Sequence, residues 1–385
     1  MLVKLTNDPR EYSWGSRTLI PDALAIEATG RPMAEIWFGT HSRSEARDAH
    51  SGQPLSQVIG HPLSFMMKFL AADYPLSIQL HPNEPQAVAG FEAENAMGIE
   101  LDDAARNFRD HHAKRETLVA LTRFDALVGF LPVHEIEARL NELAGLVSEA
   151  SASLLKRYVT LLSGADGHRA LVGDILAGDN PSPIQQGLLE EICSLESADA
   201  EHLDLPLIAR LTEIFATDRG VLIALLMKRV ELRPGDALFV ATGVPHCYLS
   251  GLAIETMTSS DNVLRGGLTE KHVSAADFMA MLDTSESLDC EPSQATVLLR
   301  GLERYDFGST DFSLHRIQVG GSNLLIDFGL PGESLLLCVD GELAISNSLD
   351  ERLVLRRGEA AYLSADANFY SISGSGMGYL GSSIN

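Results

Sequence analysis

The sequence predicts a mainly β protein that carries an α-helical insertion, organised as two β barrels and one helical domain. Three observations lead to this prediction. Short apolar runs bounded by turn residues occupy the chain up to about residue 132 and again from about residue 217. Between them, from Val133 to about Ala216, apolar residues recur at helical spacing. A segment that begins at Leu232 is echoed 123 residues later by a segment that begins at Leu355.

The length of the chain, 385 residues, is too great for one small core and suggests two or three domains. We assign residues 1–132 and 217–289 to one discontinuous β domain that carries the candidate site. Residues 133–216 form the helical domain, and residues 290–385 form a second β domain without a metal site.

The net charge of −24 argues against a surface for nucleic acid or anionic membranes. It does not exclude a small anionic ligand, because a pocket needs only local cations. No apolar run is long enough to span a bilayer, and the first residues lack the features of a signal peptide. The four cysteines are scattered and form no C-x-x-C pair, which indicates free thiols. We therefore expect a location in a reducing cytoplasm.

In the first β region, residues 75–82 read as a strand with polar side chains on one face. Ser77, Gln79 and His81 share that face in an extended chain, so Gln79 and His81 can reach one point in space. A neutral imidazole is a common zinc ligand, and a glutamine oxygen is a less usual one. On this pair alone, a polar outer face is the better interpretation. Lys68, in the preceding apolar run, is interpreted as a lysine that snorkels from a core strand.

A polar cluster that contains Lys114 and Glu116 lies just before the apolar runs at residues 118–130. A loop or the mouth of a strand would hold such a cluster. His111 and His112 are adjacent, and their side chains diverge on an extended segment, so we interpret both as solvated. The helical block that follows contains no group of reactive side chains, and we expect it to have a structural or lid role.

After the helical block, residues 221–230 are predicted to return to a strand, and residues 235–269 carry the densest set of reactive side chains. A single histidine here would more often pack in a core than bind a ligand. Carboxylates and an arginine close by favour a functional site, whereas the alternative is a buried ion network. The residues concerned are His246, Glu255, Asp261, Asn262 and Arg265.

The internal repeat that begins at Leu232 and Leu355 aligns two β regions of the chain. At the same offset, Gly251 maps onto Gly374 and His246 maps onto Phe369. Two related β barrels, of which only the first keeps a metal ligand, would explain this pattern.

The spacing of Gly235, Gly243 and His246 resembles the second motif of the cupin barrel, a jelly roll in which a turn leads to a metal-binding histidine. Ala241 stands where cupins usually have proline, and Ser250 stands where they often have asparagine.

Five stretches, in order along the chain, resemble the type I mannose-6-phosphate isomerases (phosphomannose isomerases), which are zinc enzymes of the cupin superfamily. Each stretch alone is a weak signal, but the set is specific and covers most of residues 10–135 and 220–275. The stretches are YSWG at Tyr12, AEIWFGTH at Ala34, PLSIQLHP at Pro75, KRETLVALTRFDALVGF at Lys114, and residues 243–269 from GVPHCYL to VLRGGLT.

This resemblance implies one zinc ion per chain, held by nitrogen and oxygen ligands that can leave a position open to water or substrate. The implied metal ligands are Gln79, His81, Glu116 and His246. The active-site positions of the family map to Lys68, Lys114, Glu255, Asp261 and Arg265.

Beside Lys114 the chain departs from the family pattern. Ala113 stands in place of the usual histidine, and Arg115 stands in place of the usual proline. A mechanism that requires this histidine for proton transfer is therefore in doubt. Either His112 substitutes from a neighbouring position, or the family histidine is not essential.

The resemblance implies interconversion of mannose 6-phosphate and fructose 6-phosphate, with a proton moved between C1 and C2 through a cis-enediol(ate). The metal would stabilise the developing enolate charge. A carboxylate must shuttle the proton, and Glu255 and Asp261 are both candidates. Arg265 and Lys114 are cations suited to the phosphate or to the enediolate.

We expect Lys68 and Ser77 to bind substrate, and we expect a monomer whose partner is a sugar phosphate rather than nucleic acid or a membrane. The alternative function is a non-catalytic cupin that keeps the metal and binds a sugar phosphate. Loss of an acid/base residue would distinguish that alternative, and Ala113 is the one hint of such a loss. A cupin oxygenase fits less well with a glutamine ligand and cations suited to phosphate.

Overall fold

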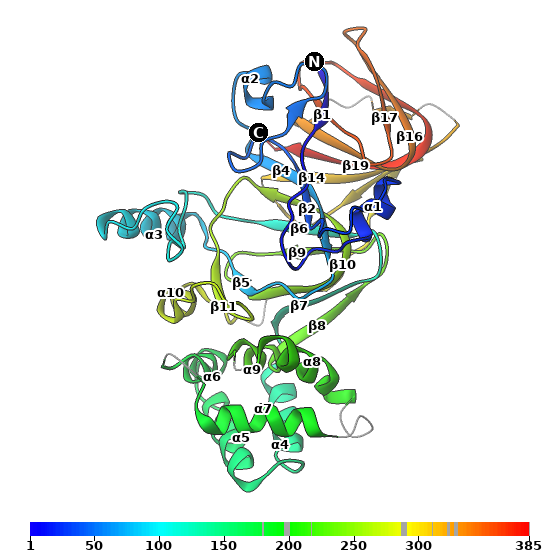
Figure 1. Ribbon diagram of the computed structural model, residues 1–385. Helices are drawn as coiled ribbons and strands as arrows, with labels where there is room; N and C mark the ends of the chain where they lie inside the picture. The colour runs from blue at the N-terminus through cyan, green and yellow to red at the C-terminus, as the bar shows by residue number, and fades with distance from the viewer. Residues whose placement is uncertain are drawn as a thin grey trace.

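Two antiparallel β sheets and a group of helices build the chain (Figure 1). A group of helices lies at the bottom of the view, the first sheet lies in the middle with further helices beside it, and the second sheet lies at the top near both termini. The computed structural model describes residues 1–178, 181–195, 201–216, 218–285, 291–309, 311–321, 324–326 and 330–384.

The first sheet is arranged around one long strand, β10 (His246–Thr258). Four other strands pair with it, two along its first residues and two along its second half. The remaining strands of this sheet are β2 (Glu35–Phe38), β4 (Phe65–Ala72), β5 (Ile78–Leu80), β6 (Glu116–Ala120), β7 (Phe124–Phe130), β8 (Met227–Leu232), β9 (Ala237–Val240) and β11 (Leu264–Gly267).

The second sheet combines the C-terminal strands with two short strands from the start of the chain. Val3 pairs with Tyr362, although residues 1–132 were expected to belong to the first β domain. The strands of this sheet are β1 (Leu2–Thr6), β3 (Arg47–Asp48), β12 (Thr296–Leu299), β13 (Leu302–Tyr305), β14 (Phe312–Gly320), β15 (Leu324–Ile326), β16 (Ser334–Asn347), β17 (Arg352–Arg356), β18 (Ala360–Leu363) and β19 (Tyr370–Ser383).

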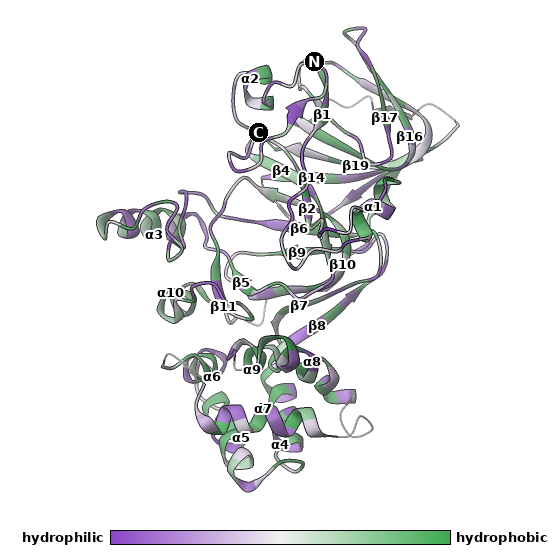
Figure 2. Cartoon of the chain, viewed as in Figure 1, coloured by the Kyte–Doolittle hydropathy of each residue, from purple (hydrophilic) through white to green (hydrophobic). Residues whose placement is uncertain are grey.

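Most of the helices lie in the block where the sequence predicts helical spacing, from Val133 to Phe215. Hydrophilic and hydrophobic residues both occur along them, as one buried face requires (Figure 2). The helices of this block are α4 (Val133–Leu143), α5 (Glu149–Leu162), α6 (Gly167–Ile175), α7 (Pro183–Ser194), the 3₁₀ helix η2 (Glu201–Leu203) and α8 (Leu205–Phe215).

The other helices flank the sheets. Residues 221–224, predicted as part of a strand, instead belong to helix α9, because an apolar run without alternation suits a buried helix equally well. Asn83 caps α3 through a capping box with Gln86. These helices are α1 (Leu19–Leu24), α2 (Leu55–Ile59), α3 (Glu84–Ala96), α9 (Gly220–Ala224) and α10 (Ala275–Met281).

Two large apolar cores hold these layers together. One core joins buried side chains of the helical block, such as Leu140, to strands of the first sheet through Leu127 and Leu249. The other core lies between the two sheets, where the rings of Phe65 and Phe312 stack with their centroids 6.4 Å apart. The first sheet is therefore covered by helices on one side and by the second sheet on the other.

The prediction of a mainly β chain with a helical insertion is confirmed. Within the ranges described above, neither hydrogen-bonded ladder closes on itself, so the prediction of two barrels is not confirmed. Cys193, Cys247 and Cys338 are free thiols, as expected, and Cys290 lies outside the described residues. None of the described helices has the length and hydrophobicity needed to cross a membrane.

The two segments of the internal repeat form strands in equivalent positions of the two sheets. Strands β9 and β18 occupy the same place in the repeat, and Gly251 and Gly374 have φ angles of +120° and +118°. A Cβ atom on Gly251 would lie 2.6 Å from the carbonyl oxygen of Arg123, and one on Gly374 would lie 2.4 Å from that of Glu342. Both positions therefore require glycine for conformation and for space.

We predict that Gly251→Ala lowers the free energy of unfolding by about 3 kcal/mol, because it adds backbone strain to a close backbone contact. Gly52→Ala is the matched control, since Gly52 has a φ angle of +72° but nothing within 4 Å of the methyl group that alanine would add. The control should lose only about 1 kcal/mol. Urea denaturation of both variants measures the difference, and equal losses would show that the close contact is unimportant.

Candidate metal centre and active site

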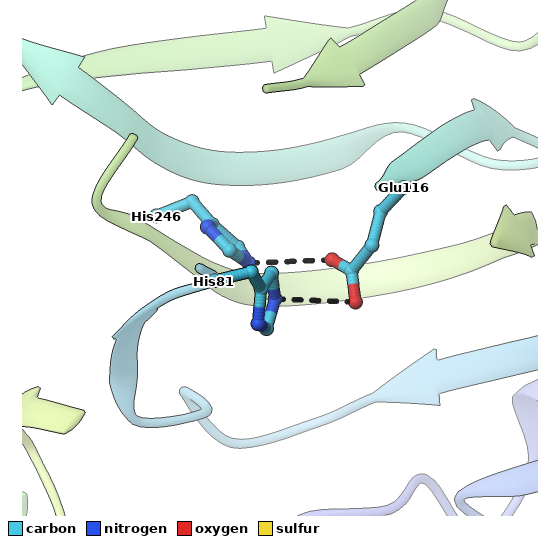
Figure 3. A group of neighbouring side chains, drawn as sticks. All are labelled: His81, Glu116 and His246. Atoms are coloured by element: carbon cyan, nitrogen blue, oxygen red, sulfur yellow. Dashed lines mark ion pairs between the residues drawn. The ribbon is translucent and has the colours of Figure 1, made fainter. Parts of the chain in front are cut away.

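Three buried side chains from separate parts of the first sheet converge on one point. His81 follows β5, Glu116 begins β6 and His246 begins β10. The Nε2 atom of His81 lies 3.4 Å from Oε1 of Glu116, and the Nε2 atom of His246 lies 3.3 Å from Oε2 (Figure 3). Figure 3 shows both imidazole rings directed at the same carboxylate.

The outer nitrogens of the two rings are fixed by backbone carbonyls. Nδ1 of His81 lies 2.7 Å from the carbonyl oxygen of Asn262, and Nδ1 of His246 lies 3.1 Å from that of Val244. A carbonyl only accepts, so each Nδ1 carries the hydrogen and each Nε2 of the neutral ring keeps a lone pair. Both Nε2 atoms are buried and have no hydrogen-bond partner in the described part of the chain.

This arrangement fits a divalent metal ion. Two ligands that are each about 2.1 Å from a tetrahedral zinc ion lie about 3.4 Å apart. The ligand atoms of His81, Glu116 and His246 lie within 4.8 Å of one another, and the two pairs given above match the expected separation. Burial and the charge of Lys114 lower the pKa of His81 to about 4, which keeps its ring neutral at pH 7.

Gln79, the fourth ligand implied by the sequence, lies on the same side of the sheet. It pairs directly with His246 across β5 and β10, and residues opposite each other on antiparallel strands share a face. Its side chain is half-buried and makes no hydrogen bond within the described residues. The amide is therefore available to a ligand beside the three-residue cluster.

Glu116 remains ionised although it is buried. Lys114 lies 2.6 Å from its Oε1, and Tyr248 donates its hydroxyl to Oε2 at 3.3 Å. Burial alone would raise the pKa of Glu116, but Lys114 and His81 hold it well below the usual value. Lys114 thus keeps this carboxylate available as a negatively charged ligand.

A second buried network lies next to the cluster, where Lys68 of β4 faces Glu255 of β10. The ammonium of Lys68 is ion-paired with Glu255 and lies 2.9 Å from Oε1 of Glu35. The two carboxylates raise the pKa of Lys68 despite its burial, and burial together with Glu116 raises the pKa of Glu255. Lys68 therefore lies in an ion network and does not snorkel to solvent.

Glu35 was not identified from the sequence. Its Oε2 accepts a hydrogen bond of 3.0 Å from the indole of Trp37. Alternation along β2 places the side chains of Glu35 and Trp37 on one face, so the sequence indicated that they are neighbours. It did not indicate that Glu35 belongs to the site, because that depends on Lys68 in the neighbouring strand β4.

Asp261 is held by two side chains from one turn. Nε2 of His41 lies 3.4 Å from its Oδ1, and Nε of Arg43 lies 3.0 Å from its Oδ2. Burial raises the pKa of Asp261, but His41, Arg43 and Lys114 outweigh that effect and lower it to about 2. The carboxylate is therefore ionised throughout the neutral range.

Arg265 lies opposite Gln79 on the neighbouring strand β11. Its half-buried guanidinium forms no hydrogen bond or ion pair within the described chain. Burial and the nearby Arg109 lower its pKa, and burial together with Arg265, Arg109 and Arg43 lowers the pKa of Lys271. Arg43 is paired with Asp261, but Arg265, Arg109 and Lys271 form no ion pair among the described residues, and such a group of cations is suited to an anionic ligand.

Asn262 belongs to the dense set of side chains that the sequence indicated at residues 235–269, but the sequence predicted no role for it. Its buried side chain accepts hydrogen bonds from the backbone N–H groups of Arg109 and Asp110, and it donates to the carbonyl oxygens of Asp110 and His112. It therefore fixes the segment that leads to Lys114, while its own carbonyl holds His81.

The departures from the family pattern can be placed in the structure. Ala113 is buried, whereas the exposed ring of His112 lies 3.4 Å from Glu84 of α3. His112 therefore does not replace an imidazole at position 113. Ser77 is half-buried, and its hydroxyl forms no hydrogen bond among the described residues.

Comparisons with known proteins agree with this site. The family model for the catalytic domain of type I phosphomannose isomerase matches residues 2–133. Mannose-6-phosphate isomerase of Salmonella typhimurium is 33% identical over 97% of both chains, and that of Escherichia coli is 30% identical over 97% of both. The human mannose-6-phosphate isomerase is 28% identical over 93% of this chain and 92% of its own.

Solved structures show the same relationship over the full length. A mannose 6-phosphate isomerase bound with zinc and yttrium has a TM-score of 0.87 at 28% identity and covers 100% of both chains. The Salmonella typhimurium enzyme bound to its substrate and to zinc has the same TM-score, identity and coverage. The sequence relatives and the shared fold lead to one conclusion: this chain belongs to the family of type I mannose-6-phosphate isomerases.

Proposed function

We propose that this chain is a zinc-dependent isomerase that interconverts mannose 6-phosphate and fructose 6-phosphate. The observation that carries the proposal is the buried cluster of His81, Glu116 and His246, whose two Nε2 lone pairs have no partner in the described structure. The relatives named mannose-6-phosphate isomerase, one of them bound to substrate and zinc, support the same activity.

In this proposal, each chain binds one zinc ion. His81, Glu116 and His246 would hold it, and Gln79 would supply a fourth ligand from the same face of the sheet. The bound ion would stabilise negative charge that develops on the substrate oxygens. Lys114, which contacts Glu116, is placed to donate to the same oxygens.

Proton transfer requires one carboxylate beside the reacting carbons, and we propose Glu255. Asp261 is held ionised by His41 and Arg43 with a pKa of about 2, so it is a weak proton acceptor at neutral pH. Glu255 is buried next to Lys68, and its pKa is raised. Glu255 would take the proton from one carbon and return it to the other through a cis-enediol(ate), with no net gain or loss of protons.

Arg265 is the proposed phosphate ligand. Its guanidinium has no ion-pair partner among the described residues, and Arg109 and Lys271 add positive charge nearby. Lys68 and Ser77 are proposed to contact the sugar, since Lys68 lies within the buried network and Ser77 is two residues before Gln79. The alternative of a non-catalytic sugar-phosphate-binding cupin is not favoured, because buried carboxylates and cations that could transfer a proton lie beside the metal cluster.

Further parts of the proposal concern the whole chain. We propose three domains with the boundaries given above, and two cupin-like sheets of which only the first holds a metal. The matched glycines Gly251 and Gly374 support a common origin for the two sheets. A monomer located in the cytoplasm completes the proposal.

The activity can be measured directly. Purified protein should convert mannose 6-phosphate to fructose 6-phosphate in a coupled assay, and chelation should abolish the conversion until zinc is returned. Elemental analysis should find about one equivalent of zinc per chain, since the structure offers one cluster in its described residues. Turnover that survives complete removal of metal would contradict the proposal.

His246→Ala should lose the zinc. At a zinc concentration about 100 times the dissociation constant, this loss should lower the free energy of unfolding by about 3 kcal/mol, which is the stability that zinc binding provides. His315→Ala is the matched control, because His315 is a buried histidine of β14 outside the cluster. Glu255→Gln should keep both zinc and fold but lose turnover. Metal content, melting temperature and rate are measured side by side; if Glu255→Gln loses zinc and His246→Ala keeps it, the two roles are reversed.

Arg265→Ala should lower kcat/KM by about 100-fold while zinc content and fold are preserved, because a bidentate contact with phosphate is lost. Arg265→Lys should be nearly as poor, since an ammonium cannot reproduce the planar contact of a guanidinium. Arg210→Ala, at an exposed position of α8, is the control. Steady-state kinetics provide the measurement, and near-normal activity of Arg265→Ala would remove Arg265 from the site.

A further inference from the structure

His41 is a buried histidine near the site, and so far it has no role in the reaction beyond its contact with Asp261. It follows β2, and only 8% of its surface is exposed. Its ring packs edge-on against Trp37, with the centroids 5.1 Å apart and the planes at 90°. A buried imidazole in a fixed orientation, next to a carboxylate of the site, requires an explanation.

The hydrogen atoms of this ring can be assigned from its contacts. The backbone N–H of Arg43 donates to Nδ1 of His41 at 3.3 Å, so Nδ1 is the acceptor and Nε2 carries the hydrogen in the neutral ring. Nε2 lies 3.4 Å from Oδ1 of Asp261 and directs that hydrogen at the carboxylate. The tautomer needed to bind Asp261 is therefore set by the turn that contains His41 itself.

The second oxygen of Asp261 is held from the same turn. Nε of Arg43 lies 3.0 Å from Oδ2, and the backbone N–H of Asp261 donates to Asp110 at 2.9 Å. The other charged groups that act on this carboxylate are Lys114 and Arg109, both from the segment that leads into β6. Asp261 thus lies between the turn at residues 41–43 and the cations of the site.

We propose that His41 is a positioning residue, which holds the carboxylate of Asp261 in a fixed orientation within the site during isomerisation. The inference rests on the proposed function and adds a residue to it. His41 acts through Asp261 and does not itself exchange a proton with the sugar. Position 113 holds alanine and provides no imidazole, so His41 is the histidine that orders this side of the site.

A double-mutant cycle tests the proposal. His41→Phe keeps an aromatic ring beside Trp37 but removes the donor to Asp261, and it should lower kcat about tenfold with little change in KM, because a hydrogen bond to a charged group is lost. His41→Gln retains an N–H donor near the position of Nε2 and should recover most of the rate. His134→Gln, at an exposed position of α4, is the control and should match the wild type.

The decisive measurement is His41→Phe in an Asp261→Asn background, where it should change kcat less than about twofold because the two residues act as one unit. Equal tenfold losses in both backgrounds would show a general structural role and overturn the inference. A His41→Phe protein with wild-type kcat would overturn it as well. If His41→Phe does not fold, the same comparison is made with His41→Gln and His41→Asn, of which only the former should retain the rate. Absence of isomerase activity in the wild type would instead overturn the proposed function, and this inference with it.

Discussion

The curvature of strand β10 is the constraint on which the site depends. His246 begins this strand and Glu255 lies nine residues later, a distance of about 30 Å along a straight strand. Both nevertheless interact with Glu116: His246 lies 3.3 Å from its carboxylate, and the charge of Glu116 raises the pKa of Glu255. A change of register between Tyr248 and Ser250, followed by the φ angle of +120° at Gly251, bends the strand. The bend brings both ends to face one interior.

Charge balance explains why this interior suits a metal and an anion. Three carboxylates, of Glu35, Glu116 and Glu255, are buried with two ammonium groups, of Lys68 and Lys114. Taken alone, the five groups leave one negative charge in a place where unpaired charge is unfavourable. A divalent cation would reverse the sign of the net charge, and the site would then attract a phosphorylated sugar in spite of the acidic surface of the whole chain.

Sequence reasoning succeeded where chemistry is carried by side chains at characteristic spacing. His81, Glu116 and His246 lie in motifs, and the structure brings all three together. The sequence did not predict contacts made by the backbone or by residues that are distant in the chain. The backbone carbonyl of Asn262, which orients His81, has no recognisable sequence motif. His41 and its partner Asp261 are far apart in the sequence. Likewise, the spacing of residues in the sequence does not reveal which strands pair. It therefore could not predict whether each sheet closes into a barrel or which sheet β1 joins. The helical block was predicted well because a period of about 3.6 residues is a local property.

The pairing of β1 with β18 has a consequence for biosynthesis. Leu2 to Leu5 are synthesised long before their hydrogen-bond partners, Ala360 to Leu363. The second sheet is therefore completed only after β18 has left the ribosome, while the first sheet and its helices can form earlier. Such a long loop between partners slows closure of the ladder, and until then both the first strand and β18 present open edges that invite pairing with other chains. The half of the molecule that contains the His81, Glu116 and His246 cluster can thus fold before β1 and β18 pair.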